Sequence, residues 1–155
     1  MIKRKKWIAF SLMILWMVLI FYFSAQAAPQ SSEQSMGIVK IIKSFAEKVS
    51  TSAKNLDISF WENVERSLRK LAHGFIYFVL GILALNFMIN CNVKRKKLMS
   101  LGICLVYAIS DEVHQLFVPG RSGQISDVFV DFTGSILGVL LFAILYFYVC
   151  SRRKA

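Results

Sequence analysis

Long apolar runs, separated by short charged segments, dominate the chain. No charged residue lies between Lys6 and Glu33, and none lies from 71 to 93 or from 132 to 151. A run of about 20 apolar residues crosses the hydrocarbon core of a bilayer as an α-helix. These three runs therefore predict membrane-spanning helices.

A fourth apolar run, from 98 to 118, is interrupted by the polar segment 110–115. Its first half is apolar and Pro119-Gly120 closes it, so we expect a span there as well. The predicted spans are about 7-27, 71-92, 98-118 and 128-150, with an outer loop at 28-70. The sequence thus predicts a single all-α domain over 1-155, an integral membrane bundle of four transmembrane helices.

The outer loop contains a segment with helical periodicity. Its apolar residues recur at three- and four-residue steps with charged residues between them: Met36, Val39, Ile42, Phe45 or Ala46, and Val49. Such spacing is typical of an amphipathic helix that lies on a membrane surface or against the bundle. We therefore add an extracytoplasmic amphipathic helix to the predicted fold. A second short helix, from 60 to 69, is expected to run directly into span two.

The N-terminus allows two interpretations. Its basic start, its apolar run and Ala25-Gln26-Ala27 together resemble a signal peptide with a cleavage site. The apolar run from Trp7 to Phe23 is longer than the core of a usual signal peptide. We therefore predict a retained helix, and the other spans keep the same orientation in either case.

The positions of the charges explain the net charge of +10 in a chain that is 56% apolar. Basic residues cluster before span one, between spans two and three, and after span four: Lys3–Lys6, Lys94–Lys97 and Arg152–Lys154. An even number of spans places these clusters on one side, which the positive-inside rule makes cytoplasmic. We therefore predict a multi-pass protein of the cell membrane with both termini cytoplasmic, in contact with membrane lipids and without nucleic acid as a partner.

Polar residues at helical spacing gather at the outer ends of three predicted helices. They lie at the start of span two, at the end of span three, and in the turn and first residues of span four. The ligand-binding candidates are Arg69, Lys70, His73, Tyr77, Asp111, Glu112, His114, Gln115, Arg121, Asp127 and Asp131. Each has a structural explanation on its own, such as an interface anchor or a first-turn residue favoured by the helix dipole. Their common depth on three helices favours a shared site.

The spacing of two glycines predicts which way the side chain of Asp131 points. Gly134 and Gly138 form a G-x-x-x-G pattern on the same helical stripe as Asp127 and Asp131. Small residues at this spacing let two membrane helices approach closely, and an ionisable group at such depth is costly toward lipid. We therefore expect Asp131 to point into the bundle.

The same residues suggest acid–base chemistry. The catalytic candidates are His73, His114, Asp111 and Asp131, with a histidine as general base or nucleophile and an aspartate orienting it. Arg121 would stabilise developing charge. No recognised metal-ligand spacing is present, so the sequence predicts no metal and no cofactor. A divalent metal held by the same four candidates is the alternative.

These motifs together resemble the VanZ-like family. They comprise Arg69–His73 with Tyr77, Asp111–Gln115, Pro119–Arg121, and Asp127–Asp131 with Gly134 and Gly138, and Phe21–Gln26 resembles the family's first span and its exit. The family is named for an accessory protein of glycopeptide-resistance clusters that confers low-level resistance to teicoplanin. The resemblance implies a compartment, the cell envelope, and no particular reaction.

Three functions are open at this point. In the first, an outward-facing site binds or modifies an anionic cell-envelope lipid or peptidoglycan precursor, with Arg121 and the N-terminus of span four holding a phosphate. Such a site could contribute to glycopeptide resistance. In the second, the protein is a membrane-embedded hydrolase or transferase. In the third, it is a non-enzymatic helper that packs against another membrane protein.

Overall fold

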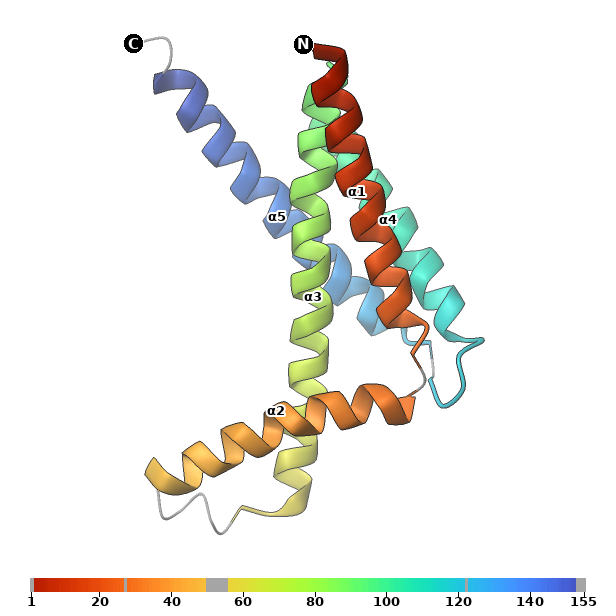
Figure 1. The fold of residues 1–155 in the computed structure, drawn as a ribbon, viewed down its shortest axis with the longest axis vertical. Coiled ribbons are helices and arrows are strands. Elements are labelled where there is room, and N and C mark those ends of the chain that lie inside the picture. Colours follow the sequence, from red (N-terminus) through yellow and green to blue (C-terminus); the bar gives the residue numbers. More distant parts are fainter. Residues whose placement is uncertain (1, 27, 50–55, 122, 153–155) are drawn as a thin grey trace.

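The computed structural model contains helices and no strands over the residues that it describes. These are all residues except 1, 27, 50–55, 122 and 153–155, with the backbone alone described at 2, 3 and 28–35. The helices are α1 (Ile2–Ser24), α2 (Ala28–Val49), α3 (Ile58–Asn90), α4 (Lys96–Gln115) and α5 (Ile125–Arg152) (Figure 1). The all-α prediction is confirmed.

Three helices within the described residues are long and apolar enough to cross a membrane. The qualifying segments are Arg4–Ser24, Ile58–Asn90 and Ile125–Arg152. Helix α4 does not qualify, because two lysines at its start and the polar residues at 110–115 lower its hydropathy. The prediction of four spans is thus confirmed for three helices, and the four-span bundle is not confirmed.

Helix α3 is the centre of the fold and contacts each of the other four helices. Helices α1 and α4 run alongside it, α5 crosses it, and α2 lies across its N-terminal part (Figure 1). The start of α3 at Ile58 confirms that the short helix expected at 60–69 continues into span two. The start of α1 and the end of α5 lie at one end of the molecule, and α2 lies at the other (Figure 1).

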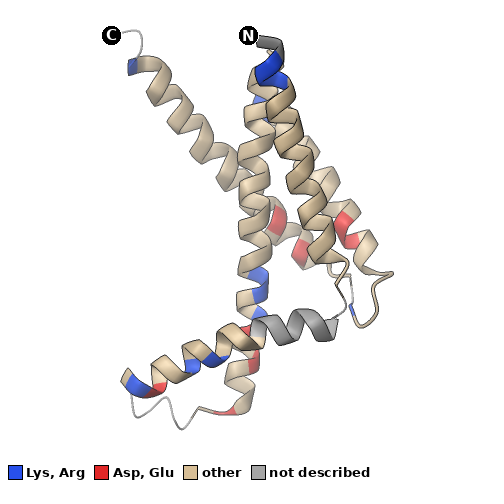
Figure 2. Cartoon of the chain, in the orientation of Figure 1, with Lys and Arg blue, Asp and Glu red and all other residues tan. Residues whose placement is uncertain are grey.

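Basic and acidic residues differ in where they lie along the molecule. Figure 2 shows Lys and Arg where α1 begins and α5 ends, and no acidic residue near that end of the described chain. Arg153 and Lys154 of the third basic cluster and Ala27 of the candidate cleavage motif lie outside the described residues. The charge distribution is therefore the one expected for helices that cross a membrane in a fixed orientation.

Helices α3 and α5 pack backbone against backbone. A Cβ atom at Gly134 would overlap the carbonyl oxygen of Gly74, and one at Gly138 would overlap that of Phe78. Neither glycine can carry a side chain without moving the helices apart. The glycine pattern is thus a helix-packing face, as its spacing predicts.

One hydrogen bond ties α1 to α3, and another ties it to α4. The indole N–H of Trp16 donates to the carbonyl of Ile76 on α3 at 2.9 Å. The hydroxyl of Tyr107 on α4 donates to the carbonyl of Met17 at 2.5 Å. Bonds of this kind help to fix helix positions where the surrounding side chains are apolar.

Helix α2 is longer than predicted and keeps its amphipathic character. It begins at Ala28, and Pro29 is compatible with the first turn of a helix. Val39 is buried, whereas Ile41 and Phe45 are 72% and 70% exposed. One side of α2 therefore packs on α3, and the other side presents apolar side chains with no cover from the described chain.

Candidate functional site

A polar cavity of about 210 Å³ lies between α3, the end of α4, the α4–α5 turn and the start of α5. It is lined by Arg66, Arg69, Lys70, His73, Gln115, Gly120, Arg121, Gln124, Asp127, Val130 and Asp131. Most of these residues were ligand-binding candidates from the sequence. The structure thus brings candidates from three helices to one cavity, and their roles as ligands stay predictions.

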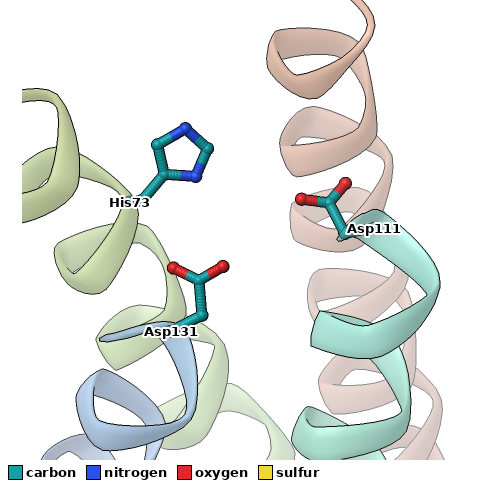
Figure 3. A group of neighbouring side chains, drawn as sticks. All are labelled: His73, Asp111 and Asp131. Atoms are coloured by element: carbon teal, nitrogen blue, oxygen red, sulfur yellow. The ribbon is translucent and has the colours of Figure 1, made fainter. Parts of the chain in front are cut away.

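Three ionisable side chains from different helices converge beside this polar cavity. His73 of α3, Asp111 of α4 and Asp131 of α5 point into the same space (Figure 3). One ligand atom from each lies within 4.8 Å of the others. We call this group the His73–Asp111–Asp131 cluster. Its histidine and carboxylates are groups that can bind a metal ion or move a proton.

The two carboxylates of the cluster are buried and incompletely paired. Asp131 is 1% exposed and Asp111 is 3% exposed. The Oδ1 atom of each has no hydrogen-bond partner among the described residues. The burial of Asp131 agrees with the inward direction that the glycine stripe predicts. An unpartnered buried carboxylate is unfavourable, so the cluster requires compensation from a proton or a cation.

Neighbouring polar groups support the cluster. The amide of Gln115 donates from Nε2 to Oδ2 of Asp111 at 3.3 Å, which orients that carboxylate. Tyr77 lies one turn beyond His73 on α3 and is fully buried, and its hydroxyl has no partner among the described residues. The ring of Tyr77 lies 6.2 Å from that of Tyr107. Tyr77 was a ligand-binding candidate, but it does not line the polar cavity.

Basic residues line the wall of the polar cavity. Lys70 pairs with Asp127, at 3.0 Å between Nζ and Oδ1, and so joins α3 to the first turn of α5. Arg69 pairs with Glu65 one turn earlier on α3. Arg66 lies one turn before Arg69 on the same helix and is exposed. The cavity therefore combines a basic wall with the buried acidic cluster.

Arg121 also has a structural role that the sequence does not reveal. Its Nε donates to the carbonyl of Gln26 at 3.0 Å, and Nη2 donates to that of Phe23 at 3.4 Å. These bonds tie the α4–α5 turn to the end of α1. Burial lowers the pKa of Arg121, and nearby Arg69 lowers it further, yet a guanidinium stays protonated in proteins. Arg121 therefore has a structural role, and its phosphate-binding role stays a prediction.

Two candidate residues point elsewhere. The carboxylate of Glu112 accepts a hydrogen bond from the backbone N–H of Gln124 and lines a separate, apolar cavity. The ring of His114 stacks on Phe21 of α1, with centroids 4.4 Å apart. The four catalytic candidates are thus not assembled as one set, because His114 lies outside the cluster.

Four residues that line the polar cavity were not among the ligand-binding candidates from the sequence: Arg66, Gly120, Gln124 and Val130. Arg66 precedes Arg69 by one helical turn and therefore continues the stripe of Arg69 and His73. That signal was available once the helix at 60–69 was joined to span two. Gln124 gave no such signal, since it lies in the turn before α5.

An apolar groove adjoins the polar cavity along α3 and α5. Its volume is about 720 Å³. It is lined by Lys70, Leu71, Gly74, Phe75, Phe78, Phe129, Val130, Thr133, Gly134 and Leu137. Lys70 and Val130 line both the groove and the polar cavity. A charged compartment and an apolar one therefore meet at Lys70.

Comparison with known proteins identifies the family. Neither the curated proteins nor the solved structures gave a match to this chain. The model of the VanZ/LLP1 family matches residues 9–146, which include the whole polar cavity and the His73–Asp111–Asp131 cluster. The motif resemblance seen in the sequence is thereby confirmed. The chain belongs to the VanZ/LLP1 family.

Proposed function

We propose that this VanZ/LLP1 protein binds an anionic, phosphate-bearing lipid of the cell envelope in the outer leaflet of the cell membrane. In the proposed orientation both termini are cytoplasmic, because the basic clusters gather at the end of the bundle that holds them. Helix α4 crosses as a fourth span, with Asp111, Glu112 and Gln115 buried inside the protein rather than facing lipid. The polar cavity then opens at the outer surface.

The observation that carries this proposal is the junction of the polar cavity with the apolar groove at Lys70 and Val130. An amphiphilic ligand needs both compartments, one for its headgroup and one for its hydrocarbon chain. The groove runs along α3 and α5, both of which are candidate spans. A lipid can therefore place its headgroup in the polar cavity while its chain stays at the depth of the membrane.

The basic wall of the cavity favours an anionic headgroup. Arg66, Arg69, Lys70 and Arg121 all line it. Arginine donors match the geometry of phosphate oxygens, and lysine adds a point charge. The pairing of Lys70 with Asp127 is half-exposed, and such pairs contribute only about 0–1 kcal/mol, so phosphate can compete for the ammonium group.

A second function, hydrolysis or transfer at the bound headgroup, is favoured by the position of the cluster. His73 and Asp131 line the same cavity as the basic residues. A phosphate group held by that wall would lie beside His73, which is placed to act as a general base. Binding is common to both functions and is therefore tested first.

The test is the lipid that copurifies with the full-length protein, measured by native mass spectrometry. Lys70→Ala should lower lipid retention by weakening headgroup binding, and Thr133→Trp should lower it by filling the groove. Matched controls are Lys97→Ala and Ile144→Trp, which alter exposed positions away from both compartments. The proposal fails if the wild type retains no anionic lipid, or if the test variants and controls retain equal amounts.

The cellular form of the proposal concerns glycopeptides. A strain lacking the gene should become more susceptible to teicoplanin and should be restored by the wild type. The Lys70→Ala variant, expressed at the same level, should restore it less well than Lys97→Ala. If both variants restore resistance equally, the proposed lipid site does not contribute to resistance.

A further inference from the structure

We propose that His73, Asp111 and Asp131 bind one divalent transition-metal ion beside the polar cavity. The three ligand atoms lie within 4.8 Å of one another and come from three different helices. Bonds from a metal to nitrogen or oxygen measure about 2.0–2.2 Å, which places neighbouring ligands roughly 3–4 Å apart. Small side-chain rotations are sufficient to close the cluster around an ion.

The buried carboxylate oxygens provide a second and independent observation. Asp131 is only 1% exposed, and its Oδ1 has no hydrogen-bond partner among the described residues. Oδ1 of Asp111 is also buried and has no hydrogen-bond partner among the described residues. Both carboxylates point into the space that His73 also faces (Figure 3). A divalent cation compensates two buried negative charges at once, and a single shared proton compensates only one.

The surroundings of the cluster are those of a metal site. Gln115 donates to Oδ2 of Asp111, and such a hydrogen bond to a ligating carboxylate is a common role of groups outside the ligand set. His73 and Asp131 also line the polar cavity. The remaining coordination positions therefore face the cavity, where water or an oxygen of a bound anion can fill them.

The ligand set selects the class of ion. One imidazole and two carboxylates form a mixed nitrogen and oxygen site, which suits Zn²⁺ or Mn²⁺. Ca²⁺ takes six to eight oxygen ligands, and Mg²⁺ keeps most of its water, so both should bind more weakly. We therefore expect Zn²⁺ or Mn²⁺ to be preferred over Mg²⁺ and Ca²⁺.

The experiment is metal binding by the full-length protein in detergent, after treatment with a chelator and without added lipid. Titration calorimetry and elemental analysis should give one Zn²⁺ or Mn²⁺ ion per chain. His73→Ala and Asp131→Asn should weaken binding by at least about tenfold, and Gln115→Leu by about tenfold, as is usual for a group outside the ligand set. Asp57→Asn, an exposed site at the start of α3, is the matched control.

Cobalt binding is measured on the wild type, so this readout does not require any variant to fold. Co²⁺ bound by the wild type should show visible absorption bands, and Zn²⁺ should displace them in a one-to-one ratio. Absence of these bands together with absence of Zn²⁺ and Mn²⁺ binding would overturn the proposal. So would equal affinity in His73→Ala and Asp57→Asn. A loss in His114→Ala as large as that in His73→Ala would overturn the three-residue ligand set.

Discussion

Gly138 of α5 lies against the carbonyl oxygen of Phe78 on α3, with no space for a side chain between the two helices. Gly134 meets Gly74 in the same way. Gly74 is the neighbour of His73 in the chain, and Asp131 lies one turn before Gly134. The close approach of the two backbones therefore sets the position of Asp131 relative to His73.

Gly138→Ala should destabilise the protein by about 1–3 kcal/mol, the usual range for overpacking a tight interface. The added methyl group meets backbone atoms of α3, which cannot rotate away as a side chain would. The separation of the helices should also weaken metal binding by the cluster. Thermal unfolding in detergent measures the first effect, and Zn²⁺ titration measures the second.

Gly102→Ala is the matched control for that substitution. Gly102 lies on α4, and nothing lies within 4 Å of a Cβ atom built there. Because alanine favours a helix over glycine by roughly 0.5–1 kcal/mol, this variant should be neutral or slightly more stable. Equal destabilisation by the two variants would contradict the packing assigned to Gly138.

Arg121→Ala should release the end of α1 from the α4–α5 turn. The variant loses two hydrogen bonds from a charged donor to the carbonyls of Phe23 and Gln26, and we expect a loss of about 1–3 kcal/mol. Amide hydrogen exchange should become faster near the end of α1 and stay unchanged in the middle of α3. Arg66→Ala, which removes an exposed arginine from the same cavity, should leave exchange in α1 unaltered.

Tyr107→Phe removes one hydrogen bond while keeping the ring. The lost bond, from the hydroxyl to the carbonyl of Met17, connects α4 with α1. Hydrogen bonds between membrane helices contribute about 0.6 kcal/mol on average and up to about 1.7 kcal/mol, so the loss should fall in that range. Unfolding in mixed micelles measures this loss of stability. An unchanged stability would contradict a stabilising hydrogen bond between α4 and α1.

Helix α2 should lie at the membrane surface with its uncovered apolar side in the lipid. Spin labels at Ile41 and Phe45, which are 72% and 70% exposed, should be accessible to oxygen dissolved in the bilayer. A label at Lys40, which is also exposed but points at least about 100° away from both positions, should instead be accessible to a water-soluble relaxation agent. The same accessibility at all three positions would place α2 away from the interface.

Periodicity along single helices made much of the site predictable. The stripe of Arg69 and His73 and the inward direction of Asp131 follow from helical spacing and from two glycines. The polar end of α4 shows the limit of that reasoning. Successive helical residues turn by about 100°, so His114 and Gln115 point about 100° apart although both lie near Asp111 in a helical projection. Only Gln115 reaches the polar cavity, and His114 faces α1.

Contacts between distant segments were not predictable. Arg121 binds carbonyls of Phe23 and Gln26, which lie 98 and 95 residues earlier in the chain. No local spacing encodes such a partner, because the docking of α1 depends on the packing of the whole bundle. The number of spans is a similar case, since the buried polar residues of α4 lower the hydropathy by which a span is recognised.

The sideways opening of the apolar groove would determine how the proposed lipid arrives. The groove lies on the outer faces of α3 and α5, where Leu71, Phe75 and Phe129 are 70%, 64% and 68% exposed. A lipid can enter it by two-dimensional diffusion within its leaflet, without leaving hydrocarbon for water. Occupancy would then follow the mole fraction of that lipid in the membrane, so a change in envelope composition would alter the loading of the protein directly.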